Sequence, residues 1–181
     1  TPLERLIEKQ KRDAPSEEDG ARQFEILMEE MRRRGYIHYE ISNFCREGYI
    51  SRHNSSYWRG IPYLGAGASA HSYDGKSRQW NTADVIAYID GIGKGTIPSD
   101  REILTPERLY NEYVMTSLRT MWGMSLSRAE SLIGKNHIEQ CRSVLERYIT
   151  SGQLIMKDDR IYLSDGGKLI ADRIIADLFC A

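Results

Sequence analysis

The densest group of side chains that could do chemistry lies in residues 51–58, SRHNSSYW. His53 and Tyr57 are four residues apart, so their rings would share a face on a helical turn, and Ser51 would cap that turn. An imidazole presented in this way could ligate haem iron, transfer a proton or bond a carboxylate. The same residues also fit a polar turn in which the histidine only hydrogen-bonds while Trp58 packs beneath it.

The other histidines and the cysteines form no metal-binding pattern. No two histidines have the spacing of metal ligands, and there is no Cys-x-x-Cys run. Cys45, Cys141 and Cys180 are odd in number and far apart, which favours a reducing compartment, the cytoplasm, over a disulfide framework. We expect neither a signal peptide nor a membrane span. Because Thr1 stands where a methionine would begin a gene product, we expect a fragment of a longer protein.

A glycine pattern follows the histidine motif. Gly65, Gly67 and Ala70 match the G-x-G-x-x-A spacing of dinucleotide-binding loops, which requires a strand before it and a helix after it. Residues 61–64 are short and contain a proline, and no good helical pattern follows. The glycines therefore favour a backbone turn that lets a ligand or a neighbouring strand come close.

Composition limits the classes of partner. The chain has 181 residues, enough for one domain or two small ones, and its 25 basic and 26 acidic residues leave a net charge of −1. Such a balance indicates no general attraction to nucleic acid or to an anionic membrane. We therefore expect no nucleic-acid partner.

The first half of the chain predicts a helix followed by a strand. Acidic residues after Ser16 begin a helical pattern that ends at Gly35, and residues 36–42 alternate as a strand does. A helix, a turn and a strand are typical of α/β folds, in which ligands gather at the carboxyl ends of strands. Residues 46–81 are rich in loops, Asn81 and Thr82 could cap a short helix, and the glycines and proline of residues 91–98 predict a boundary.

The second half predicts a small helical domain. Thr105 and Pro106 begin a helix, and capping boxes at Ser127 and Asn136 predict two more. Residues 154–157 and 160–163 predict a β-hairpin, and a last helix follows Ser164. Helices followed by such a hairpin indicate a winged-helix-like domain. The predicted fold class is α/β followed by a mainly α part.

Three stretches together resemble one family: YEISNF at 39–44, RHNSSYW at 52–58 and YLGAGASA at 63–70. They resemble radical S-adenosylmethionine (SAM) proteins related to oxygen-independent coproporphyrinogen III oxidase, and the HNxxYW run is similar to the haem chaperone branch, HemW. The resemblance implies that residues 1–98 are the last part of a partial (β/α) TIM-type barrel. Residues 99–181 would be the helical carboxyl-terminal domain of the HemN type.

The resemblance also implies cofactors and their sites. The whole protein would hold SAM, a [4Fe–4S] cluster and haem, but the family's Cys-x-x-x-Cys-x-x-Cys run is absent, so we expect this chain alone to carry no cluster and no catalytic residue. His53 would bind haem. Asn54, Tyr57 and Trp58 would shape the surroundings of the haem. Asn43, Phe44 and Cys45 would line the SAM side of the barrel mouth through backbone groups, and Gly65 and Gly67 are further expected cofactor-binding residues.

Two activities and an interaction role remain open at this point. A chaperone would pass haem to an acceptor protein, which could be membrane-associated. An oxidase would instead decarboxylate coproporphyrinogen III to protoporphyrinogen IX through a SAM-derived radical. Residues 99–181 could also serve only as a docking module, and the exposed strand edges of an open barrel could lead to a dimer.

Overall fold

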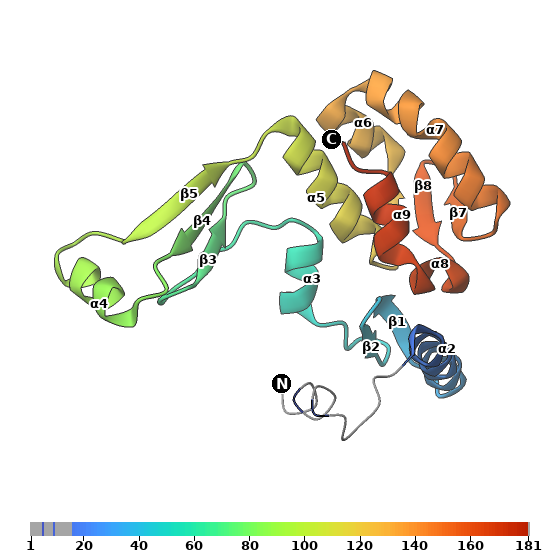
Figure 1. Ribbon diagram of the computed structural model, residues 1–181, viewed down its shortest axis with the longest axis horizontal. Helices are drawn as coiled ribbons and strands as arrows, with labels where there is room; N and C mark the ends of the chain where they lie inside the picture. Colours follow the sequence, from blue (N-terminus) through green and yellow to red (C-terminus); the bar gives the residue numbers. More distant parts are fainter. Residues whose placement is uncertain (1–4, 6–8, 10–15, 181) are drawn as a thin grey trace.

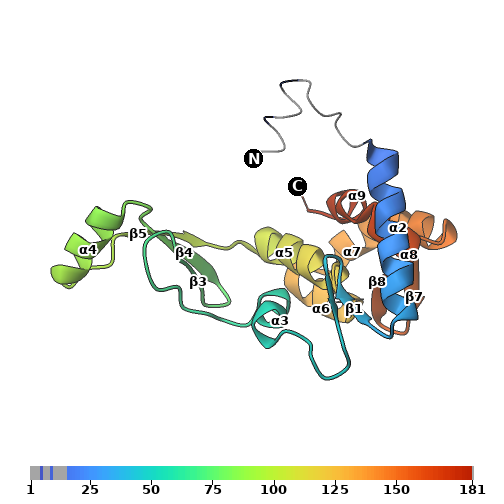
Figure 2. The ribbon, with the colours of Figure 1, turned by 90° about the horizontal axis from the view of Figure 1, so that it is seen from below.

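A computed structural model describes residues 5, 9 and 16–180, which form an elongated molecule (Figures 1 and 2). The rest of residues 1–15, which belong to the predicted barrel portion, lie outside the described residues. Helices and strands alternate along the chain, so the predicted mixed α/β class is confirmed. The strands form three small sheets, ordered β1-β2, β3-β4-β5 and β6-β8-β7, and every strand pair among the described residues is antiparallel. The closed or partial barrel therefore stays a prediction.

The first elements are α2 (Glu17–Arg33), β1 (Ile37–Glu40) and β2 (Asn43–Cys45). The Ser16 hydroxyl accepts the Asp19 N–H at 3.0 Å, as its position before the acidic turn predicts. The predicted strand 36–42 is shorter than expected. Its last residues instead turn the chain, so that residues 43–45, which lie just beyond the predicted strand, pair back onto β1.

The middle of the molecule holds α3, one sheet and α4. Their bounds are α3 (Arg52–Trp58), β3 (His71–Tyr73), β4 (Ser77–Asn81), α4 (Val85–Gly93) and β5 (Ser99–Ile103). The expected cap at residues 81–82 was wrong, because the Asp84 carboxylate accepts the first free N–H groups of α4. The α4 helix also runs through Gly91 and into the predicted boundary segment. Since β5 begins just after residue 98 and pairs with β4, the division into 1–98 and 99–181 stays a prediction.

The last part contains most helices and the third sheet. Its elements are α5 (Pro106–Leu118), β6 (Met124–Ser125), α6 (Leu126–Ile133), α7 (Lys135–Thr150), β7 (Leu154–Lys157), β8 (Arg160–Leu163), α8 (Asp165–Leu169) and α9 (Ala171–Asp177). The hairpin is confirmed. The caps predicted at Ser127 and Asn136 were wrong, because Ser125 and Gly134 precede those helices. The predicted last helix is broken at Ile170 into α8 and α9. The winged-helix comparison stays a prediction.

The main hydrophobic cluster lies wholly within this last part. It runs from Tyr110 to Leu178, and Val114, Ile161 and Ile174 at its centre have no exposed surface. The Tyr110 hydroxyl donates to the Leu178 carbonyl at 3.0 Å, which satisfies a polar group inside the core. The strand β1 is attached to this body from outside, because Met121 N–H donates to the Tyr39 carbonyl and Ile41 N–H to the Arg119 carbonyl, both at 3.0 Å.

Candidate functional site

His53 lies in the first turn of α3, as its spacing from Ser51 and Tyr57 predicts. The Ser51 hydroxyl accepts the Asn54 N–H at 3.2 Å, and the His53 and Tyr57 rings meet edge to face with their centroids 5.0 Å apart. The His53 side chain is exposed, so its imidazole is open to a ligand from solvent.

The opposite side of α3 is fixed to the body. The Asn54 amide donates to the Tyr39 hydroxyl at 3.5 Å, and the Arg119 guanidinium lies 5.6 Å from the centre of the Trp58 ring. The indole N–H of Trp58 and the hydroxyl of Ser55 are buried without a hydrogen-bond partner among the described residues. Trp58 therefore packs beneath the turn, and the helix presents His53 outward.

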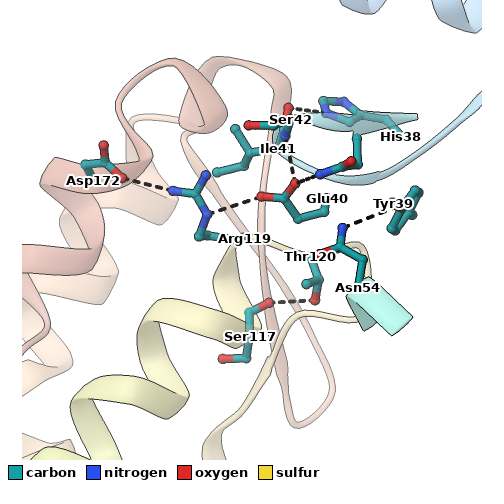
Figure 3. Close-up of polar contacts among 11 residues, drawn as sticks. His38, Tyr39, Glu40, Ile41, Ser42, Asn54, Ser117, Arg119, Thr120 and Asp172 are labelled. Carbon is teal, nitrogen blue, oxygen red and sulfur yellow. Dashed lines mark hydrogen bonds and ion pairs between the residues drawn. The ribbon is translucent and has the colours of Figure 1, made fainter. Parts of the chain in front are cut away.

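Arg119 connects three segments at this point, and Figure 3 shows two of its contacts, those with Glu40 and Asp172. Its guanidinium pairs with Glu40 of β1 and with Asp172 of α9, each at 3.2 Å, in addition to its contact with Trp58. The Glu40 side chain is only 1% exposed, and it also accepts from the Ser42 N–H and the Asn43 amide. A buried carboxylate is tolerated because all of these donors face it.

A cleft of about 860 Å³ lies beside α3, between β3, β4, α5 and the β6–β8 strands. Tyr57 lies at its edge, Tyr63 is 4.7 Å from Tyr57, and Tyr73 is 6.2 Å from Tyr63, measured between ring centroids. A series of aromatic rings thus leads from His53 into the cleft. Burial raises the pKa values of Tyr63 and Tyr73, so both phenols stay neutral. The volume lies within the range of small-molecule sites.

The residues expected on the SAM side lie elsewhere. None of Asn43, Phe44 and Cys45 lines the cleft. Phe44 stacks on His38 at 4.1 Å, and Cys45 is buried, which raises the pKa of its thiol. Their contact with SAM stays a prediction.

The glycine loop makes the close approach that its sequence predicts, and the neighbour is a strand. A Cβ on Gly65 would lie 2.1 Å from the carbonyl oxygen of His71. The Asn81 amide donates to the Gly67 carbonyl at 2.9 Å. The strand β3 follows where a dinucleotide loop requires a helix, which agrees with the sequence in disfavouring a dinucleotide site. Cofactor binding by Gly65 and Gly67 stays a prediction.

Sequence reasoning missed the basic side chains of the cleft. Arg59, Arg78, Arg128 and Arg160 all line it, although about twenty or more residues separate each from the next. No local spacing could have connected them, because the fold alone brings them together.

The described residues contain neither a metal-binding cluster nor a membrane-spanning helix. No group of three or more His, Cys, Asp or Glu side chains within them is arranged to hold a metal ion. No helix in the same part of the chain is long and apolar enough to cross a membrane.

No family model matches the chain. It is 34% identical over 170 residues to the haem chaperone HemW of Bacillus subtilis, covering 93% of this chain and 45% of that protein. It is 32% identical over 179 residues to HemW of Mycobacterium tuberculosis, covering 98% of this chain and 44% of that protein. The chain therefore spans less than half the length of these relatives.

A solved structure shows a similar fold. Coproporphyrinogen III oxidase (HemN) from Escherichia coli, a radical SAM enzyme, matches with a TM-score of 0.68 at 17% identity. The match covers 93% of this chain and 43% of that one. The chain is therefore a homologue of the HemW haem chaperones, and its fold matches part of a radical SAM protein.

Proposed function

We propose that this chain supplies the haem-binding part of a HemW-like haem chaperone, which holds haem through His53 and passes it to an acceptor protein. The observation that carries the proposal is the exposed His53 imidazole on a capped turn, next to an aromatic cleft and within the HNxxYW motif. Homology to HemW proteins supports the same assignment.

The position of His53 suits binding followed by release. A neutral imidazole ligates haem iron, and the exposed face lets the flat macrocycle approach without opening the core. Tyr57, 41% exposed beside His53, offers apolar surface to the ring. A ligand held at a rim, and not enclosed, can leave for a tighter acceptor.

The iron–sulfur cluster does not fit the cysteines of this chain. A cluster ligand is a thiolate, and burial raises the thiol pKa values of Cys45 and Cys141, which favours the protonated form. These residues also lack the family's close spacing. Cluster and SAM chemistry would therefore belong to a longer protein, and we derive no step from them.

Coproporphyrinogen III oxidation is the second candidate. The similarity in fold to HemN favours it, and an aromatic cleft would suit a porphyrinogen as well as haem. We rank it second because its radical step depends on a cluster that these residues do not ligate, whereas haem binding through His53 depends on this chain alone. A cytoplasmic location, a soluble or membrane-associated acceptor, and a dimer all remain predictions.

The test is a haem titration of the protein, followed through the Soret band. Wild type should give a shifted band, and His53→Ala should lose that shift and bind haem at least about tenfold more weakly, because the iron loses its axial ligand. His71→Ala is the matched control, since His71 is an exposed imidazole on β3 that does not line the cleft. Equal haem affinity and equal spectra for wild type and His53→Ala would refute the proposal.

A further inference from the structure

The cleft carries a strong positive charge. Its lining includes four arginines and a single carboxylate, Glu112, which gives a formal charge of +3 in a chain whose net charge is −1. Charge concentrated in this way inside a concave aromatic site indicates an anionic ligand.

The four arginines of the cleft differ in their ion-pair and hydrogen-bond partners. Arg78 pairs with Glu112 at 2.5 Å, whereas Arg59, Arg128 and Arg160 have no carboxylate within ion-pair distance in the part of the chain that the structure describes. One N–H of Arg160 donates to the Trp122 carbonyl at 2.9 Å. Arg59 and Arg128 are thus the cations most available to a ligand.

Aromatic rings hold these two guanidinium groups in place. Arg59 lies over Trp122, 4.3 Å from the ring centre, and Arg128 lies over Tyr113 at 4.7 Å. A guanidinium stacked on a ring keeps the N–H donors at its edge, where they can meet a carboxylate in the two-bond geometry that arginine favours.

We propose that Arg59 and Arg128 bind the propionate carboxylates of a tetrapyrrole whose ring lies against the aromatic wall of the cleft. This inference rests on the proposed function for the identity of the ligand, and it adds a second set of contacts to His53. Tyr57 connects the two, because its ring meets His53 on one side and lines the cleft on the other. The iron ligand and the carboxylate ligands would thus hold the centre and one edge of the same flat molecule.

The first test needs no variant. Metal-free protoporphyrin IX, which iron ligation cannot hold, should bind wild type with quenched tryptophan fluorescence. Its dimethyl ester should bind roughly tenfold more weakly or worse, because it offers no carboxylate to the arginines. Equal affinities for the free acid and the ester would overturn the proposal.

The second test uses Arg59→Gln/Arg128→Gln. This variant should bind the free acid roughly five- to thirtyfold more weakly than wild type and should not distinguish the acid from the ester. The conservative pair Arg59→Lys/Arg128→Lys should recover part of the loss. Arg142→Gln is the control, because Arg142 is an exposed arginine of α7, paired with Glu139 and absent from the cleft. Wild-type affinity in the double glutamine variant would overturn the proposal.

Haem titrations separate this inference from the proposed function. The double glutamine variant should need a higher haem concentration to become saturated. At saturation it should reach the wild-type Soret position, because His53 still ligates iron. His53→Ala should lose the Soret shift but keep its affinity for metal-free protoporphyrin. If His53→Ala leaves the haem spectrum unchanged while the arginine variants weaken protoporphyrin binding, the chaperone assignment of His53 fails and the cleft assignment stands.

Discussion

Arg119 joins β1, α9 and α3 through a single guanidinium group. It is the cation that faces the buried Glu40 carboxylate, and it also contacts Asp172 and the ring beneath the histidine turn. Removing one partner of a buried pair is costly because the other charge stays without compensation.

We therefore predict that Arg119→Ala lowers the free energy of unfolding by about 2–4 kcal/mol. Arg142→Ala, at an exposed pair, should change it by less than about 0.5 kcal/mol. Urea unfolding measures both. Adding Glu40→Gln to Arg119→Ala should recover part of the loss, and an Arg119→Ala variant as stable as the Arg142→Ala control would contradict the account.

We expect His38 to make the free energy of unfolding depend on pH. Its Nε2 lies 2.9 Å from the Ile41 carbonyl and its Nδ1 3.3 Å from the Lys168 ammonium, so the neutral ring donates to the carbonyl and accepts from the lysine. Burial lowers the pKa of His38, the Lys168 charge lowers it further, and Ile41, Asp165 and Glu40 oppose the shift.

The direction of this pH dependence follows from which state of the chain, folded or unfolded, binds the proton more readily. Below about pH 6.5 the unfolded chain takes up a proton at this histidine more readily than the folded chain, so the free energy of unfolding falls as the pH is lowered through that range. We predict that denaturant midpoints fall between pH 7.5 and 5 in wild type, and less steeply in His38→Gln. The exposed control, His71→Gln, should keep the wild-type slope; a His38→Gln slope equal to that of wild type would refute this role.

Among the elements, α3 carries His53, the proposed haem ligand. A helix of seven residues is too short to be stable alone, so α3 must be held by its cap and by its contacts with the body of the protein. These contacts are the Asn54–Tyr39 hydrogen bond and the packing of Trp58 against Arg119. The Ser51 cap aligns the turn that carries His53.

Ser51→Ala should therefore weaken haem binding although residue 51 does not touch the ligand. Loss of an N-cap costs about 1 kcal/mol, and the cost falls on the conformation that presents His53. Haem affinity should drop several-fold while the Soret position at saturation is unchanged. Ser51→Asn, which keeps a capping oxygen, should bind as wild type does, and an unaffected Ser51→Ala would show that the cap does not position the imidazole.

The elements that the sequence predicted well are those with strong local signals. The helices α2 and α5 and the β7–β8 hairpin have caps, periodic apolar residues or a turn dipeptide within a few residues. Strands β2 and β3 have three residues each, and β4 and β5 are joined through α4, so their pairing depends on contacts distant in sequence. The arginines of the cleft could not be predicted as a group because they, too, are distant in sequence. The HNxxYW motif could be recognised because its residues are contiguous.

In the whole molecule, the main cluster of buried hydrophobic side chains lies at one end of the sequence. The cluster from Tyr110 to Leu178 is contained within the last part, whereas β1 and α3 attach to it from outside (Figure 1). A contiguous core of this kind can support independent folding.

Residues 99–181 expressed alone should therefore unfold in one cooperative transition. The urea midpoint of this fragment should lie below that of the whole chain, because the fragment lacks the backbone hydrogen bonds that join Tyr39 and Ile41 to this part. The fragment should not give the Soret shift of haem, since α3 is absent. Circular dichroism with urea tests the first expectation, and a fragment without a cooperative transition would show that the predicted division at residue 98 does not separate a folding unit.

The proposed function depends on ligation of haem iron by the side chain at position 53, and this can be tested by exchanging the ligand atom. In His53→Cys the axial ligand would change from imidazole nitrogen to thiolate sulfur, which alters the electronic structure of the iron. We predict that the absorption and electron paramagnetic resonance spectra of ferric haem change from the imidazole type in wild type to the thiolate type in the variant. Identical spectra for the two proteins would contradict it.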